Sequence, residues 1–147
     1  MVNKIRHTGI VVDDLSKSLR FYRDLLGFEV VKRAKENGPY IERILALGNA
    51  SVTTVKMTSH DGQMIELLSY TTPSEKKQER KINDVGLSHI ALAVIDIDCE
   101  YERLRKESVE FISNPVLSPD GYAKVAFCRA PEGTFIELVE VIRQNIL

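Results

Sequence analysis

Apolar residues alternate with polar ones in many short stretches of this chain, and a period of two predicts β-strands. Two other stretches, each following an aspartate that can cap a helix, have apolar residues three to four positions apart, which is typical of a helix. Segment 40–47 fits either a short helix or a strand, and turn residues border it. The strands are expected over 4–12, 28–34, 51–59, 63–70, 87–95, 109–113, 124–130 and 134–142, and the helices over 15–28 and 99–108.

The second half of the chain repeats this pattern. An offset of 82 positions places His89 on His7, and an offset of 71 positions places Glu137 on Glu66. Each half then reads as one strand, one helix and three strands, and one such repeat leaves a sheet face that a second repeat can cover. The prediction is therefore an α+β protein with two tandem βαβββ modules that form a cup-shaped mixed sheet.

Segment 73–86 has no apolar periodicity and mixes both charges, which is typical of a solvated linker. We therefore divide the chain into module one (1–72), the linker (73–86) and module two (87–147). At 147 residues, the two modules together have the size of one ordinary domain.

Each module ends in a strand with one carboxylate among apolar residues. Ile65 and Leu67 lie on one face of the first of these strands, and Glu66 lies on the other. A carboxylate that is buried without a partner costs several kcal/mol, roughly, so Glu66 and Glu137 should meet a cation or hydrogen-bond donors. We predict a shared metal ion.

The first strand of each module supplies the other candidate ligands, His7 and His89. Two imidazoles and two carboxylates suit zinc, nickel or cobalt, and also manganese or iron, better than calcium or magnesium. A six-coordinate ion would keep two positions for water or substrate. Gly9 and Ala91 follow the histidines on the same face and are small, which leaves room for a ligand.

The alternative for a single strand histidine is a hydrogen-bonded core residue, and its recurrence with a glutamate in both modules favours the metal site. His60 has no counterpart in the other module and is read as a turn residue.

Composition excludes several classes of function. The formal net charge of −1 and the pI near 6.3 give no electrostatic basis for binding nucleic acid or an anionic membrane. No apolar run approaches the roughly 20 residues that cross a bilayer, and the N-terminal sequence does not read as a signal peptide. Cys99 and Cys128 form no metal or disulfide motif, so we expect free thiols and a cytoplasmic protein.

The sequence resembles the vicinal oxygen chelate superfamily, which includes glyoxalase I, methylmalonyl-CoA epimerase, fosfomycin-resistance proteins and extradiol dioxygenases. The resemblance rests on RHTGIVVDDLSKSLRFYRDLLGFEVV, GQMIELLSY, GLSHIALAVIDID and PEGTFIELVEV, and it covers nearly the whole chain. It implies paired βαβββ modules around a divalent metal, with His7, Glu66, His89 and Glu137 as ligands. It also implies a homodimer, because the modules of one site can come from one chain or from two.

The ligand set is similar to that of glyoxalase I and the epimerase. Family members that act on glutathione adducts carry an Arg shortly after the first ligand and an Asn shortly after the first Glu. Residues 8–11 and 67–70 contain neither, which argues against a glutathione substrate. The resemblance implies a lyase or isomerase that removes a proton next to a metal-bound carbonyl, with Glu137 as the base.

Other residues and functions stay open at this point. Glu42 could be a second base of the epimerase kind or an exposed charge, and Arg43 or Lys124 could meet an anionic substrate. The expected partner is a small carbonyl or thioester substrate, which segments 34–50 and 113–122 would select. The alternatives are a fosfomycin-type resistance transferase and a non-enzymatic drug-binding protein.

Overall fold

A computed structural model of the chain describes residues 1–71 and 79–142. The chain divides into two compact units, Met1–Gln78 and Glu79–Leu147, and the predicted linker spans their junction. Residues 72–78 of that linker and the tail 143–147 lie outside the described residues, while residues 79–87 are exposed. Over the described residues, no helix is long and apolar enough to cross a membrane.

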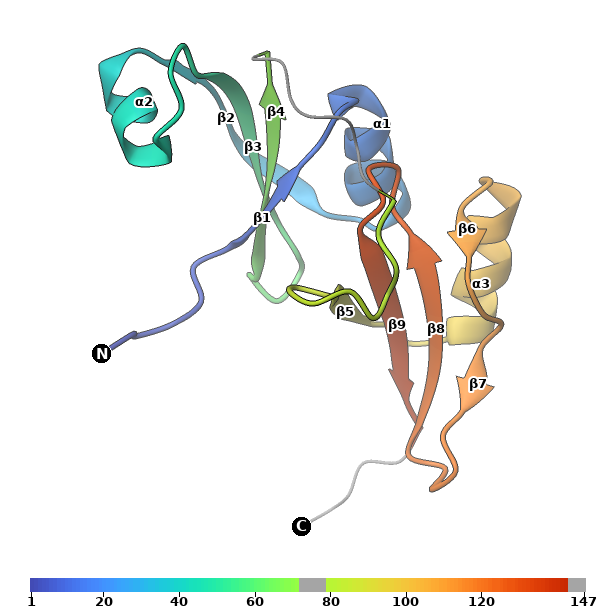
Figure 1. The fold of residues 1–147 in the computed structure, drawn as a ribbon. Helices are drawn as coiled ribbons and strands as arrows, with labels where there is room; N and C mark the ends of the chain where they lie inside the picture. Colours follow the sequence, from blue (N-terminus) through green and yellow to red (C-terminus); the bar gives the residue numbers. More distant parts are fainter. Residues whose placement is uncertain (72–78, 143–147) are drawn as a thin grey trace. The chain divides into compact units, whose positions relative to one another are not determined.

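The first unit is a four-stranded mixed sheet with its helices (Figure 1). The strand order is β1-β4-β3-β2, with β1 parallel to β4 and the other neighbours antiparallel. The elements are β1 (Thr8–Val11), α1 (Leu15–Leu19), the π-helical segment η1 (Arg20–Leu25), β2 (Glu29–Asn37), α2 (Pro39–Leu45), β3 (Ser51–Thr58) and β4 (Met64–Tyr70).

The second unit repeats this topology. Its strand order is β5-β9-β8-β6, with β7 also paired to β8, and β5 is parallel to β9. The elements are β5 (His89–Ala93), α3 (Ile97–Lys106), β6 (Glu110–Phe111), β7 (Val116–Leu117), β8 (Ala123–Arg129) and β9 (Phe135–Val141). Helix α3 packs on β8 and β9 (Figure 1). The prediction of an α+β protein with duplicated βαβββ modules is confirmed.

The start of the helices follows from the sequence. Asp14 caps α1, because its carboxylate accepts a hydrogen bond from the Lys17 backbone N–H at 3.0 Å. The helix then widens into a π-helical turn, where the Leu26 N–H donates to the Phe21 carbonyl. Gly27 follows with φ of +80°, the left-handed conformation that ends a helix at little cost.

Several predicted bounds differ from the structure. The first strand begins at Thr8 rather than at residue 4, and β6 holds only Glu110–Phe111 of the predicted strand 109–113. The segment 40–47, left open between helix and strand, is mostly helical, because Pro39 occupies the first helical turn where its missing N–H is not needed. The predicted loop 113–122 contains the short strand β7, which pairs with Val125 and Lys124.

Strand alternation separates an apolar face from the face that carries the candidate ligands in each sheet. Ile65 and Leu67 are buried on one face of β4, opposite Met57 and Val55 of β3. In β9, Ile136 and Leu138 are buried likewise. Glu66 and Glu137 lie on the other face of their strands, as predicted from the alternation.

Candidate functional site

Each unit brings its predicted histidine and glutamate together. The His7 Nε2 atom lies 3.0 Å from Glu66 Oε2, and the His89 Nε2 atom lies 3.0 Å from Glu137 Oε2. The strand register explains the match, because Gly9 pairs with Glu66 and Ala91 pairs with Glu137 in the two parallel ladders. The repeat offsets found in the sequence therefore correspond to equivalent places in the two sheets.

The glutamate of the first pair is buried. Its side chain is 11% exposed, against 21% for Glu137, so both carboxylates have lost much of their contact with water. Such carboxylates require partners, and here each one has a histidine of its own unit. In addition, Lys56 Nζ lies 3.6 Å from Glu66 Oε1.

The hydrogen bonds of Ser88 set the orientation of the His89 ring. The Ser88 hydroxyl donates to the Ile82 carbonyl at 3.0 Å, and the same oxygen lies 3.2 Å from His89 Nδ1. Since the single hydroxyl proton is used on Ile82, Ser88 accepts a hydrogen bond from Nδ1–H. In a neutral ring, the Nε2 lone pair then faces the Glu137 carboxylate, and a cation beside both atoms would bring them together; in a protonated ring, Nε2–H instead donates a hydrogen bond to the carboxylate.

The first histidine is not a satisfied core residue. His7 Nδ1 is buried, and among the described residues it has no hydrogen-bond partner. A buried nitrogen without a partner costs free energy, which favours a functional reason for placing His7 against Glu66.

The donor atoms suit a first-row divalent metal. Two ligand atoms that each lie about 2.1 Å from one ion, at a right angle around it, are about 3.0 Å apart. Both histidine–glutamate pairs have this spacing, which is also the length of a hydrogen bond. Within the described residues of either unit, no group of three or more metal-binding side chains comes together. The four-residue ligand set thus remains a prediction, for which each unit supplies one half.

The room expected beside Gly9 is bounded by a neighbouring side chain. A Cβ atom at Gly9 would lie 3.2 Å from Leu68 Cδ1, so glycine allows Leu68 to approach β1. Leu68 and Tyr70 share the face of Glu66, and they pack against a cluster formed by Ile41, Ala50 and Val52. Helix α2 therefore covers part of the same face.

This placement bears on the predicted second base. Glu42 follows Ile41 in α2 and is half-buried, on the helix that packs over the face of Glu66. Arg43 is exposed on the same helix. Lys124, the other candidate for meeting an anionic substrate, forms an ion pair with Asp98.

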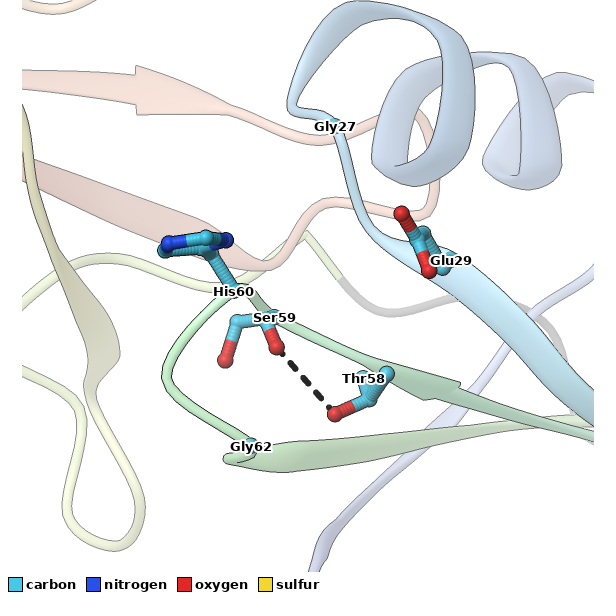
Figure 2. Close-up of a pocket in the computed structure, with 6 residues that line it drawn as sticks. All are labelled: Gly27, Glu29, Thr58, Ser59, His60 and Gly62. Atoms are coloured by element: carbon cyan, nitrogen blue, oxygen red, sulfur yellow. Dashed lines mark hydrogen bonds between the residues drawn. The ribbon is translucent and has the colours of Figure 1, made fainter.

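A pocket of about 390 Å³ lies at the β3–β4 turn and the start of β2. Figure 2 shows Glu29 and His60 at this pocket, with Thr58 donating a hydrogen bond to the Ser59 carbonyl. His60 lies in the turn, as predicted. Neither His7 nor Glu66, the histidine–glutamate pair of the same unit, lines this pocket.

The sequence reasoning missed Lys56 and Ser88. A signal for Lys56 was present, because the turn at 59–62 sets the register of the β3–β4 hairpin and pairs Lys56 with Glu66. No sequence pattern marks Ser88, since its hydrogen bond to the Ile82 carbonyl depends on the irregular backbone conformation of segment 79–88.

Known proteins show similar sequences and folds. The family model described as Glyoxalase/Bleomycin resistance protein/Dioxygenase superfamily matches residues 4–138. A lactoylglutathione lyase from Haemophilus influenzae is 32% identical over 93% of this chain and 92% of its own length. A 2-epi-5-epi-valiolone epimerase from an Actinomyces species is 24% identical over 93% of this chain and 79% of its own length. The crystal structure of a glyoxalase family protein from Bacillus cereus superimposes with a TM-score of 0.88, at 26% identity over 97% of each chain.

Proposed function

The chain belongs to the Glyoxalase/Bleomycin resistance protein/Dioxygenase superfamily, and from this premise we propose a metal-dependent lyase or isomerase that removes a proton next to a carbonyl. The observation that carries this proposal is the pair of a histidine and a glutamate at the same place in both modules, with both Nε2–Oε2 distances at 3.0 Å. The relatives named as a lyase and as an epimerase support the same class.

His7, Glu66, His89 and Glu137 would hold a divalent ion such as zinc, nickel or cobalt. When bound, such an ion polarises the substrate carbonyl and so acidifies the neighbouring C–H bond. The carboxylates contribute two negative charges to the site, and the histidines bind as neutral imidazoles. In the second pair, the Ser88 hydroxyl keeps the proton on Nδ1 and leaves Nε2 for coordination.

Glu137 is the proposed base. It is the more exposed of the two glutamates, and its β8 neighbour in the ladder is Phe127, which cannot neutralise it. Glu42 is the proposed second acid or base for a reaction that delivers the proton to the opposite side of the carbon. Its position on α2, over the face of Glu66, supports this role. The proposed substrate is a small carbonyl compound or thioester, and the proposed assembly is a homodimer.

Proton exchange tests this function. The metal-loaded protein is incubated in D₂O with hemithioacetals of 2-oxoaldehydes and with 2-methyl-acyl-CoA thioesters, and deuterium at the α-carbon is followed by NMR. We expect exchange with at least one of these classes, loss of exchange in Glu137→Gln, and retention in the control Glu110→Gln, which alters an exposed glutamate of β6. Absence of exchange with both classes, or full exchange in Glu137→Gln, would contradict the proposal.

A further inference from the structure

The first sheet carries a row of charged residues beside the candidate site. Gly9, Glu66, Lys56 and Lys32 are consecutive partners in the register across β1, β4, β3 and β2. Directly paired residues point to the same face of a sheet, so both lysines extend from the face of Glu66. The 3.6 Å distance from Lys56 Nζ to Glu66 Oε1 confirms this for the nearer lysine.

In the equivalent row of the second sheet, the glutamate has apolar neighbours. Ala91, Glu137 and Phe127 are consecutive partners across β5, β9 and β8, and the Ile112 backbone N–H donates to the Phe127 carbonyl at 2.8 Å. The Phe127 ring meets the His89 ring edge-on, with centroids 5.3 Å apart. Two repeat-related glutamates therefore have opposite neighbours, a cation for Glu66 and an aromatic ring for Glu137.

Lys56 changes the charge of the proposed centre. Two carboxylates balance the charge of one divalent ion, and neutral histidines add nothing, so the four ligands and the ion are neutral together. The ammonium of Lys56, whose side chain is 27% exposed, leaves this centre with one positive charge. That charge opposes binding of the metal cation and favours an anion beside it.

We propose that Lys56, with Lys32 beyond it, is a specificity-determining residue that selects substrates carrying an anionic group in addition to the oxygens that bind the metal. This inference rests on the proposed metal site. It assigns the anionic end of the substrate to the first module, where the basic row lies, and it explains why only one of the two repeat-related glutamates has a cation as its partner on the adjacent strand.

Two hydroxamates that share a chelating head group test the proposal. Acetohydroxamate carries no further charge, whereas succinic acid monohydroxamate carries a carboxylate. The affinity for Co²⁺ is measured first, by competition with a chromophoric chelator, and each hydroxamate is then titrated into the Co²⁺-loaded protein. We expect the wild-type protein to bind the carboxylate-bearing probe more tightly.

Replacing Lys56 should change the two affinities in opposite directions. In Lys56→Met and Lys56→Gln, Co²⁺ should bind about tenfold more tightly, because a positive charge about 6 Å from a divalent ion is removed in a water-like dielectric. The preference for the carboxylate-bearing probe should fall about fivefold, as expected for a partly exposed ion pair. The matched control is Lys35→Met, a lysine of the same strand as Lys32 that pairs with Thr53 and points to the other face.

The outcomes separate this proposal from the proposed function. A wild-type protein that binds no Co²⁺ would overturn both. If the Lys56 variants bind Co²⁺ but keep the wild-type preference between the two probes, the specificity role alone is overturned. The same holds if the affinities for Co²⁺ and for the carboxylate-bearing probe both fall, because that result indicates damage to the site. Equal effects in Lys35→Met would also overturn it, because they would show a general effect of net charge rather than the position of Lys56.

Discussion

The hydrogen bond between Ser88 and His89 leads to a sharp prediction about metal binding. Ser88→Ala removes the oxygen that lies 3.2 Å from His89 Nδ1 and that links this ring to the Ile82 carbonyl. The ring would keep its contact with Phe127 but would lose the acceptor that holds the proton on Nδ1, so that the proton could move to Nε2 and block its lone pair. Loss of such a supporting contact lowers metal affinity by about 10- to 100-fold. The free energy of unfolding should fall by about 1 kcal/mol, the usual value of one hydrogen bond.

A competition titration with Co²⁺ and a chromophoric chelator measures this effect on the wild type and the variant. Ser88→Thr keeps the hydroxyl and is the matched control, with an affinity expected close to that of the wild type. The first pair has no equivalent variant, since among the described residues His7 Nδ1 has no hydrogen-bond partner that a mutation could remove. Wild-type metal affinity in a folded Ser88→Ala protein would refute the reasoning.

Three other predictions concern the core, a buried thiol and the second base. Ile136 is fully buried in β9, so Ile136→Ala should lower the free energy of unfolding by about 2–5 kcal/mol in urea titrations, and a loss below 1 kcal/mol would contradict its burial. Burial raises the pKa of the Cys128 thiol from 9.0 to about 12. As pH rises, this thiol therefore ionises first in the unfolded chain, and the free energy of unfolding falls by about 2 kcal/mol between pH 8 and 10.5. The Cys128→Ala variant should lack this part of the pH dependence. An unchanged pH dependence in the variant would refute the raised pKa of Cys128. Glu42→Gln should abolish epimerisation of a chiral 2-methyl-acyl-CoA while α-proton exchange continues, as followed by NMR, and unchanged epimerisation would exclude Glu42 as the second base.

The duplicated topology could be predicted because its signals are local. Alternation within a strand decides which face each residue occupies, and this placed Glu66 and Glu137 opposite the buried faces of β4 and β9. The repeat offsets then related each histidine to its counterpart, and in the structure each histidine contacts the glutamate of its own module. Local pattern and strand period were sufficient to indicate these two pairs of residues.

The neighbours of the site need more than alternation to predict, because they depend on pairing between segments. Lys56 meets Glu66 only through the register of the β3–β4 hairpin. Leu68 occupies space beside Gly9 because β1 and β4 are parallel neighbours, a pairing that alternation alone does not reveal. Lys124 was a candidate for substrate binding, but its ion pair with Asp98 of α3 depends on how that helix packs on the sheet.

The metal content of the purified protein tests the central claim most directly, with elemental analysis of the wild type, His7→Ala and His89→Ala. A shared centre predicts one divalent ion per chain in the wild type and loss of tightly bound metal in each variant, whether the two modules of a site come from one chain or from two. Two ions per chain, with one lost in each variant, would show that the two pairs act separately. That result, or metal-free wild-type protein after loading, would contradict the account.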